Sequence, residues 1–199
     1  MAHSVPETPG LEARPELAAA LVFLDGTRTP GWTVRDLGCW FDREVVPLGV
    51  MARPLMANEP VAGTVALYPG AERSQTGASI LPKVLLAARI RVLGPLRGLL
   101  ESPADDRFLA STIFSGRVRR QRVDGNAQWA AHPEPTAPLS AIVLSLLAVD
   151  ILSHRELYDR ELCVCDVCGR VSFDPKAADR KTCGEHSPSS SGFVWKAVR

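Results

Sequence analysis

The feature that most constrains this chain is a cluster of cysteines close to its C-terminal end. Two residues separate Cys165 from Cys168, Gly169 follows, fourteen residues separate Cys168 from Cys183, and two more lie between Cys183 and His186. A C-x2-C turn places two thiolates within reach of one tetrahedral ion at about 2.3 Å, and glycine supplies the backbone freedom that closes such a turn. The spacing therefore predicts one structural zinc ion held by Cys165, Cys168, Cys183 and His186.

The residues between the two ligand pairs suffice for two short strands and a turn at Asp174-Pro175. This length predicts a zinc-ribbon-like or treble-clef-like module, which is too small for a hydrophobic core and would depend on its metal to fold. Iron–sulfur ligation and a redox-active C-x-x-C pair are the competing interpretations, and a histidine in the fourth place with no βαβ pattern disfavours both. Four protein ligands leave no open position for water, so zinc catalysis is not expected.

Cys163 is an ambiguous member of the cluster. It lies two residues before Cys165, and it could replace Cys165 as a ligand or remain a small buried side chain. The second interpretation is favoured because unligated cysteine commonly behaves as a buried apolar residue.

Composition limits the class of protein. The chain of 199 residues is 46% hydrophobic and 23% charged with a formal net charge of +1, which is typical of a folded globular protein without a strong overall field. The apolar stretch 80–100 is interrupted by four basic residues, so no membrane span is expected. No secretory signal pattern opens the chain, and clustered cysteines favour metal binding in a reducing cytoplasm.

The pattern of helix and strand signals predicts a helix-rich α+β protein in three parts. Residues 1–15 are expected to form a flexible tail, residues 16–160 one mixed domain ending in a long amphipathic helix, and residues 161–199 the zinc-binding module and tail. A short helix or a buried segment is predicted over Pro15–Leu24, ending at Asp25-Gly26. Another is predicted to begin at Thr33, where Asp36 completes a capping-box-like pattern.

The middle of the chain gives mixed signals. The segment 64–68 between two glycines suits a strand, and 88–93 suits either a strand or a helix that Gly94-Pro95 would break. Ser102-Pro103 predicts a helix start, with an end at Gly116. The segment 122–138 is rich in turn formers and predicts an extended loop, after which a long helix is expected from about Pro138 to Arg160.

Three further groups of residues are candidates for function or for the core. Asp150 and His154 are four residues apart on the last predicted helix, where they could form an acid–base pair, although a simple hydrogen bond beside the zinc module is the commoner outcome. A dense basic run could bind phosphate or could be a solvated edge; it consists of Arg117, Arg119, Arg120 and Arg122. Core positions are predicted for Cys39, Phe41, Phe108 and Phe114, whereas Trp32 and Trp129 lie in loop-like sequence.

These observations favour a zinc-stabilised, non-enzymatic adaptor or regulatory protein that contacts another protein through the zinc module and its basic, aromatic tail with Phe193 and Trp195. The alternative is a nucleic-acid-binding regulator that uses the run 117–122 together with the zinc module. An enzyme using Asp150 and His154 is a third hypothesis, for which no nucleophile or glycine-rich phosphate loop is found.

Overall fold

The computed structural model describes residues 11–25, 29–52, 75–102, 106–155 and 162–173. Its helices and strands follow in chain order: a 3-10 turn Leu11–Ala13, α1 Pro15–Leu24, a 3-10 turn Thr29–Gly31, α2 Val34–Trp40 with a π-helical turn Phe41–Val45 and a 3-10 turn Val46–Leu48, α3 Gln75–Glu101, α4 Arg107–Phe114, β1 Val118–Val123, β2 Asn126–Ala131, α5 Leu139–Ser153, β3 Leu162–Val164 and β4 Val171–Phe173. The helix-rich α+β class predicted from the sequence is confirmed.

Helix α5 is the centre of the fold. All but three of its fifteen residues are buried. Helices α1 and α3 pack against it, and α4 covers a further part of its surface. Because α5 is enclosed on nearly every side, it is apolar around its circumference rather than amphipathic. The helix ends at Ser153, so the predicted continuation to Arg160 is wrong over the described residues 154 and 155.

The N-terminal helices are joined by aromatic packing. The predicted capping box is confirmed, since the Asp36 amide donates to the Thr33 hydroxyl at 3.2 Å and the Thr33 amide donates to the Asp36 carboxylate at 2.9 Å. On the buried side of α2, the Trp40 indole donates a hydrogen bond of 3.0 Å to the carbonyl of Ala19 in α1. The Trp40 ring also lies 5.4 Å from that of Phe23, which fixes α2 against α1.

The prediction that Gly94-Pro95 would break a helix is wrong for α3. The helix is continuous through Pro82 and Pro95. Burial outweighs the local penalty of about 3 kcal/mol for each proline, because an apolar stripe of α3 is inserted in the core. The stripe consists of Leu81, Val84, Leu85, Ala88, Val92, Leu96 and Leu99.

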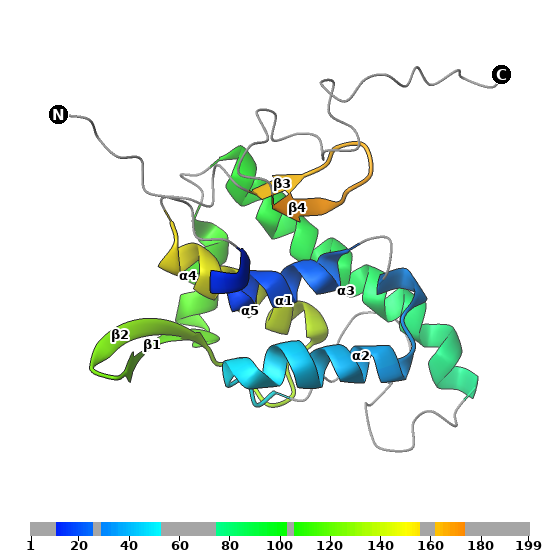
Figure 1. Cartoon of the computed structure of the whole chain (residues 1–199). Coiled ribbons are helices and arrows are strands. Elements are labelled where there is room, and N and C mark those ends of the chain that lie inside the picture. Colours follow the sequence, from blue (N-terminus) through cyan, green and yellow to red (C-terminus); the bar gives the residue numbers. More distant parts are fainter. Residues whose placement is uncertain (1–10, 26–28, 53–74, 103–105, 156–161, 174–199) are drawn as a thin grey trace.

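Two small antiparallel sheets complete the fold of the described part of the chain. Strand β1 pairs with β2, and β3 pairs with β4. The expectation of a loop over 122–138 is wrong as far as Ala131, because 126–131 is a strand. Figure 1 shows the β1–β2 hairpin projecting from the helices, whereas β3 and β4 lie over α1 and α3.

The structure confirms some of the predicted core positions and shows that others are wrong. Phe41 is buried and Phe108 packs partly against the core, as predicted. Phe114 is 90% exposed and Cys39 is exposed, so their predicted core positions are wrong. The strand predicted at 64–68 and the helix start at Pro103 lie outside the described residues. None of the helices in the described part of the chain combines the length and apolarity needed to span a bilayer.

Candidate functional site

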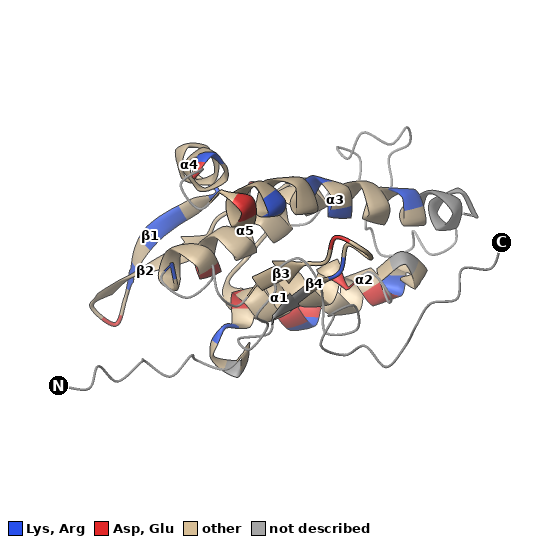
Figure 2. Cartoon of the chain, turned by 90° about the horizontal axis from the view of Figure 1, so that it is seen from above, with Lys and Arg blue, Asp and Glu red and all other residues tan. Residues whose placement is uncertain are grey.

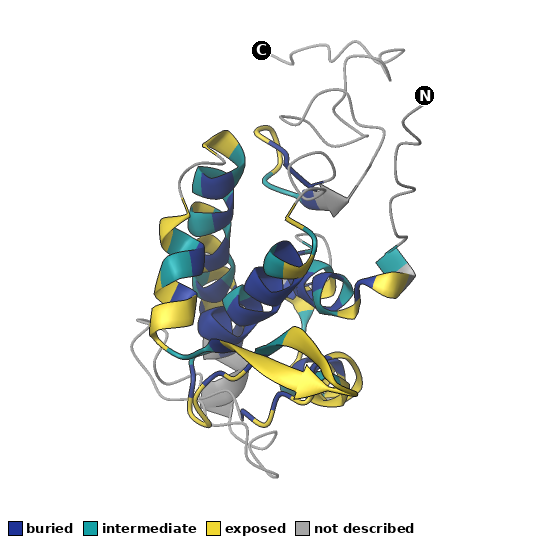
Figure 3. Cartoon of the chain, turned by 90° about the vertical axis from the view of Figure 1, so that its left-hand side faces the viewer, coloured by how far each residue is buried: buried dark blue, intermediate teal, exposed yellow. Residues whose placement is uncertain are grey.

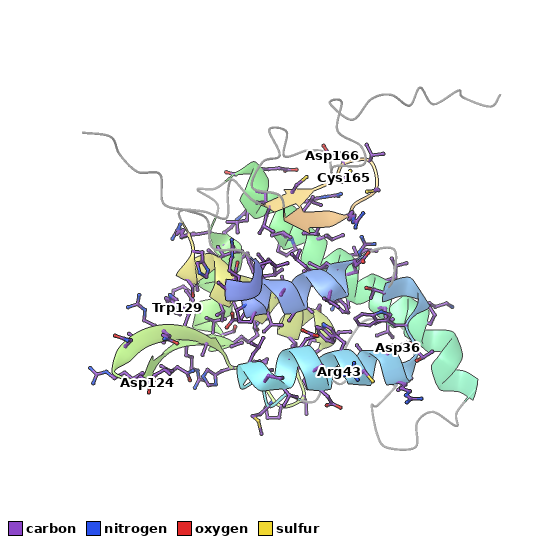
Figure 4. All side chains as sticks on the ribbon, in the orientation of Figure 1. Asp36, Arg43, Asp124, Trp129, Cys165 and Asp166 are labelled. Atoms are coloured by element: carbon purple, nitrogen blue, oxygen red, sulfur yellow. The ribbon has the colours of Figure 1, made fainter. Side chains whose placement is uncertain are left out.

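The first half of the predicted zinc site forms the turn between β3 and β4. The Cys165 amide donates to the carbonyl of Arg170 at 2.9 Å, and the Gly169 amide donates back to the carbonyl of Cys165 at 2.7 Å. Gly169 has a φ of +65°, the left-handed conformation that glycine adopts without steric cost. Cys165 is buried and Cys168 is exposed. Figure 4 shows Cys165 and Asp166 at the end of the molecule opposite α2.

The other cysteine of the cluster belongs to a strand. Cys163 lies in β3, is paired with Ser172 in the register, and is only 2% exposed. The C-x2-C pair, Cys165 and Cys168, lies instead in the turn between β3 and β4. Cys183 and His186 lie outside the described residues, and within those residues no group of three or more His, Cys, Asp or Glu side chains could hold a metal ion.

Two arginines of α3 approach the cysteine turn. Arg89 donates from its Nη2 atom to the carbonyl of Gly169 at 3.0 Å. Arg97 Nη2 lies 3.9 Å from the position that a Cβ atom on Gly169 would take. Burial lowers the pKa of the Arg89 guanidinium from its ordinary value, and the charges of Asp25 and Cys168 partly oppose this effect. The turn therefore rests on a cationic surface.

The predicted basic run forms most of strand β1. Strands β1 and β2 are joined at Asp124-Gly125, whose φ angles of 51° and 82° are those of a two-residue type I′ hairpin turn. All of β1 after Val118 is exposed, and Figure 3 shows the hairpin as an exposed arm. We call residues 117–131 the arginine ribbon. Side chains alternate between the faces of a strand, so Arg120 and Arg122 lie on one face and Arg119 on the other.

The guanidinium groups of the arginine ribbon contact neutral groups of the described residues. Arg117 donates to the Ser115 hydroxyl at 2.7 Å, and Arg119 donates to the carbonyl of Gly116 at 3.0 Å. Arg120 is directly across from Trp129 in the register and lies 5.0 Å from the centre of its ring. Within the described residues none of the four arginines forms an ion pair with a carboxylate. Figure 2 shows the resulting concentration of basic residues along β1.

The candidate acid–base pair is part of a buried ionic cluster. Arg14 contacts Asp150 through two hydrogen bonds, from Nε to Oδ1 at 2.9 Å and from Nη2 to Oδ2 at 2.6 Å, and both side chains are fully buried. His154 Nδ1 lies 3.3 Å from the same carboxylate. Burial raises the pKa of nearby Glu16, to which the negative charge of Asp150 adds a smaller increase. Asp150 is therefore held in a structural contact between α1 and α5.

Sequence reasoning missed three of these residues. Arg14 is 136 residues from Asp150, so no local pattern links them. Arg89 and Arg97 are read from the sequence as interruptions of an apolar stretch, and only the packing of α3 brings them to Gly169. The hairpin, in contrast, has a local signal in Asp124-Gly125 between two runs of strand length.

Comparison of the chain with protein-family models, with curated proteins and with solved structures found no match.

Proposed function

We propose that this chain is a zinc-stabilised, non-enzymatic regulatory protein that binds nucleic acid through the arginine ribbon. The observation that carries the proposal is the exposure of three arginines on a projecting hairpin, Arg119, Arg120 and Arg122, none of which is ion-paired with a carboxylate in the described residues. Solvent-exposed guanidinium groups that lack acidic neighbours are available to phosphate oxygens, which arginine binds through paired hydrogen bonds.

The shape of the ribbon supports the same partner. A two-stranded hairpin can enter the major groove of a duplex, which is about 12 Å wide. Arginines on both faces of β1 could then reach phosphates on both sides of the groove. The net charge of +1 does not oppose such binding, because a local cluster of charge determines the field close to the surface.

A non-enzymatic role is supported by the environment of Asp150. Its two carboxylate oxygens accept hydrogen bonds from Arg14 in a fully buried position. A general base must be within reach of a substrate proton, directly or through one water molecule. Asp150 is instead committed to holding α1 against α5.

The nucleic-acid proposal is tested by fluorescence anisotropy with a labelled duplex over a range of salt concentrations. The ribbon variant Arg119→Gln/Arg120→Gln/Arg122→Gln should bind weakly, and its slope of log K against log salt should be smaller by about 0.9 for each phosphate that the variant no longer neutralises. The matched control Arg35→Gln/Arg43→Gln/Lys83→Gln removes three exposed cations elsewhere and should retain most of the affinity and the slope. Equal losses in both triple variants would contradict a specific role for the ribbon.

The zinc component rests on the ligand spacing and on the turn geometry at Cys165–Gly169. Elemental analysis of protein purified without chelator should give one zinc per chain. Cys168→Ser and Cys183→Ser should each remove the metal or greatly weaken its binding, whereas Cys39→Ser should not. Wild-type protein free of zinc, with residues 161–199 nevertheless resistant to proteolysis, would contradict a structural metal.

A protein-binding adaptor is the second candidate. It is favoured by exposed apolar side chains, since Val167 at the cysteine turn is 67% exposed and Phe114 beside the ribbon is 90% exposed. Such an interface would be retained at high salt and after nuclease treatment, because apolar contacts are not screened. Co-purification of a partner under those conditions, abolished by Val167→Asp, would support the adaptor over the nucleic-acid function.

A further inference from the structure

The outward face of α3 carries large apolar side chains in contact with solvent. Leu86 and Ile90 lie about one turn apart on this helix, and they are 54% and 60% exposed. Figure 2 shows α3 along one edge of the molecule. Single apolar side chains are common on protein surfaces, whereas a continuous apolar row is typical of a surface that binds a partner. The question is therefore how far this row extends.

The row continues into two glycines. Residues four apart follow one ridge along a helix, so Leu86, Ile90, Gly94 and Gly98 form a single row on α3. At both glycines the space that a side chain would occupy is open, with no atom of another described element within 4 Å. Glycine disfavours a helix, so neither residue helps to form α3. The row therefore has two large side chains in its first half and two open notches in its second half.

The two ends of this face carry opposite charges. Lys83 precedes the row and Glu101 follows it, eighteen residues later, which is five full turns and places both on the same side of the helix. Both are exposed, and neither forms an ion pair with another described residue. About 27 Å of helix separates them, so they do not neutralise each other within one chain.

A row of this kind is complementary to its own copy in the reverse direction. In an antiparallel pair of α3 helices, Ile90 of each copy faces Gly94 of the other. The same register places Leu86 of each copy over Gly98 of the other. Each large side chain thus meets an open notch, which lets the two helices approach closely. A parallel pair would instead place large side chains against each other.

We infer that the outward face of α3 is the interface of a symmetric antiparallel dimer, formed with a second copy of this chain. The register that matches large side chains to notches also brings Lys83 of each copy beside Glu101 of the other. Two-fold symmetry forms every one of these contacts twice. A second copy is the partner that fits, because shape and charge are both complementary to the same face reversed. The inference rests on neither the zinc site nor nucleic-acid binding.

The dimer is tested by sedimentation equilibrium of the full-length protein over a range of concentrations. Wild type should dimerise reversibly, and a wild type that is monomeric throughout would overturn the inference. Ile90→Asp should weaken association about 100-fold or more, because it places two charges in an apolar contact. The control Met51→Asp changes an apolar residue outside α3 that is 84% exposed, and it should leave association unchanged.

A second variant separates loss of the dimer from loss of the fold. Gly98→Leu should weaken association about 10-fold or more, since the new side chain fills the space that Leu86 of the second copy needs. Leucine is a better helix former than glycine, so the dilute variant should be at least as helical as wild type by circular dichroism. Association as strong as in wild type would overturn the predicted contact.

The register is tested by exchanging the two charges. Lys83→Glu should weaken association about 5- to 30-fold, because two pairs of carboxylates would then meet across the interface. Lys83→Glu/Glu101→Lys should restore it, since attraction returns with the signs reversed. Failure of the double variant to recover would overturn the antiparallel register. A monomeric wild type that Ile90→Asp destabilises would show that the chain itself covers this face, and would overturn the dimer.

Discussion

Arginine has opposite roles in two regions of this molecule. Arg14 is fully buried and shares two hydrogen bonds with Asp150, whereas the arginines of β1 extend into solvent without an acidic partner in the described residues. The side chain and its charge are the same, so the surroundings determine what it does. Where water is excluded the guanidinium needs a carboxylate, and it then holds two helices together. Where water is present it needs none, and its charge is available to a ligand.

The largest effect is expected at the buried pair. Arg14→Met should lower the free energy of unfolding by about 3–5 kcal/mol, because Asp150 would be left buried without its counter-charge. Arg14→Met/Asp150→Leu should recover most of this stability, since it removes both charges. Chemical denaturation is the measurement. The exposed counterpart Arg120→Met should change stability little, and a large decrease there would remove the contrast between the two regions.

The next effect concerns the aromatic ring beneath Arg120. Trp129→Ala should cost about 1–3 kcal/mol of binding free energy if a base of a single strand stacks on this ring. A duplex whose phosphates are contacted by the arginines should be bound almost as well as before. Anisotropy with single-stranded and duplex probes of equal length distinguishes base stacking on Trp129 from phosphate contacts by the arginines. Our groove-binding proposal requires that Trp129→Ala lower the affinity for the duplex less than the affinity for the single strand.

A third variant changes the shape of the ribbon without changing its charge. Gly125→Val forces a β-branched residue into a φ of 82° and should destabilise the hairpin by about 1–2 kcal/mol or more. Nucleic-acid affinity should fall although all four arginines remain. The melting temperature should change little, since most of the ribbon lies outside the core. Undiminished affinity would mean that the charges act without the hairpin geometry.

The smallest effect is expected at Glu16, beside the buried pair. Burial raises the pKa of this carboxyl in the folded protein above its ordinary value of 4.5; a backbone hydrogen bond partly opposes this effect, and the charge of Asp150 adds a smaller increase. Its contribution to stability is therefore fully present below pH 4.5 and is lost as the pH rises through the folded-state pKa. Glu16→Gln should remove this dependence and be more stable than wild type at neutral pH. Denaturation at pH 4 and at pH 7 is the test, and a lower stability of the variant at pH 7 would contradict the burial effect.

Local sequence determined the features whose causes lie within a few residues. The capping box needs only Thr33 and Asp36, the left-handed turn needs Gly169, and the hairpin turn needs Asp124-Gly125. The turn formers of the segment 122–138 nevertheless predict a loop over residues that form strand β2, because glycine, asparagine and proline are typical of turns whether or not strands flank them. The spacing of Cys165 and Cys168 likewise predicts half of a metal site from one turn of chain.

Tertiary structure alone decided the features that depend on distant partners. Helix α3 continues through Pro95 because its apolar stripe is buried, which no local propensity indicates. Asp150 is in a structural ion pair because Arg14, 136 residues away, is folded against it. Arg89 contacts the cysteine turn because the fold likewise brings Gly169 beside it. Burial and charge pairing are properties of the whole packed chain, whereas turns and caps are set by the hydrogen bonds and backbone angles of neighbouring residues.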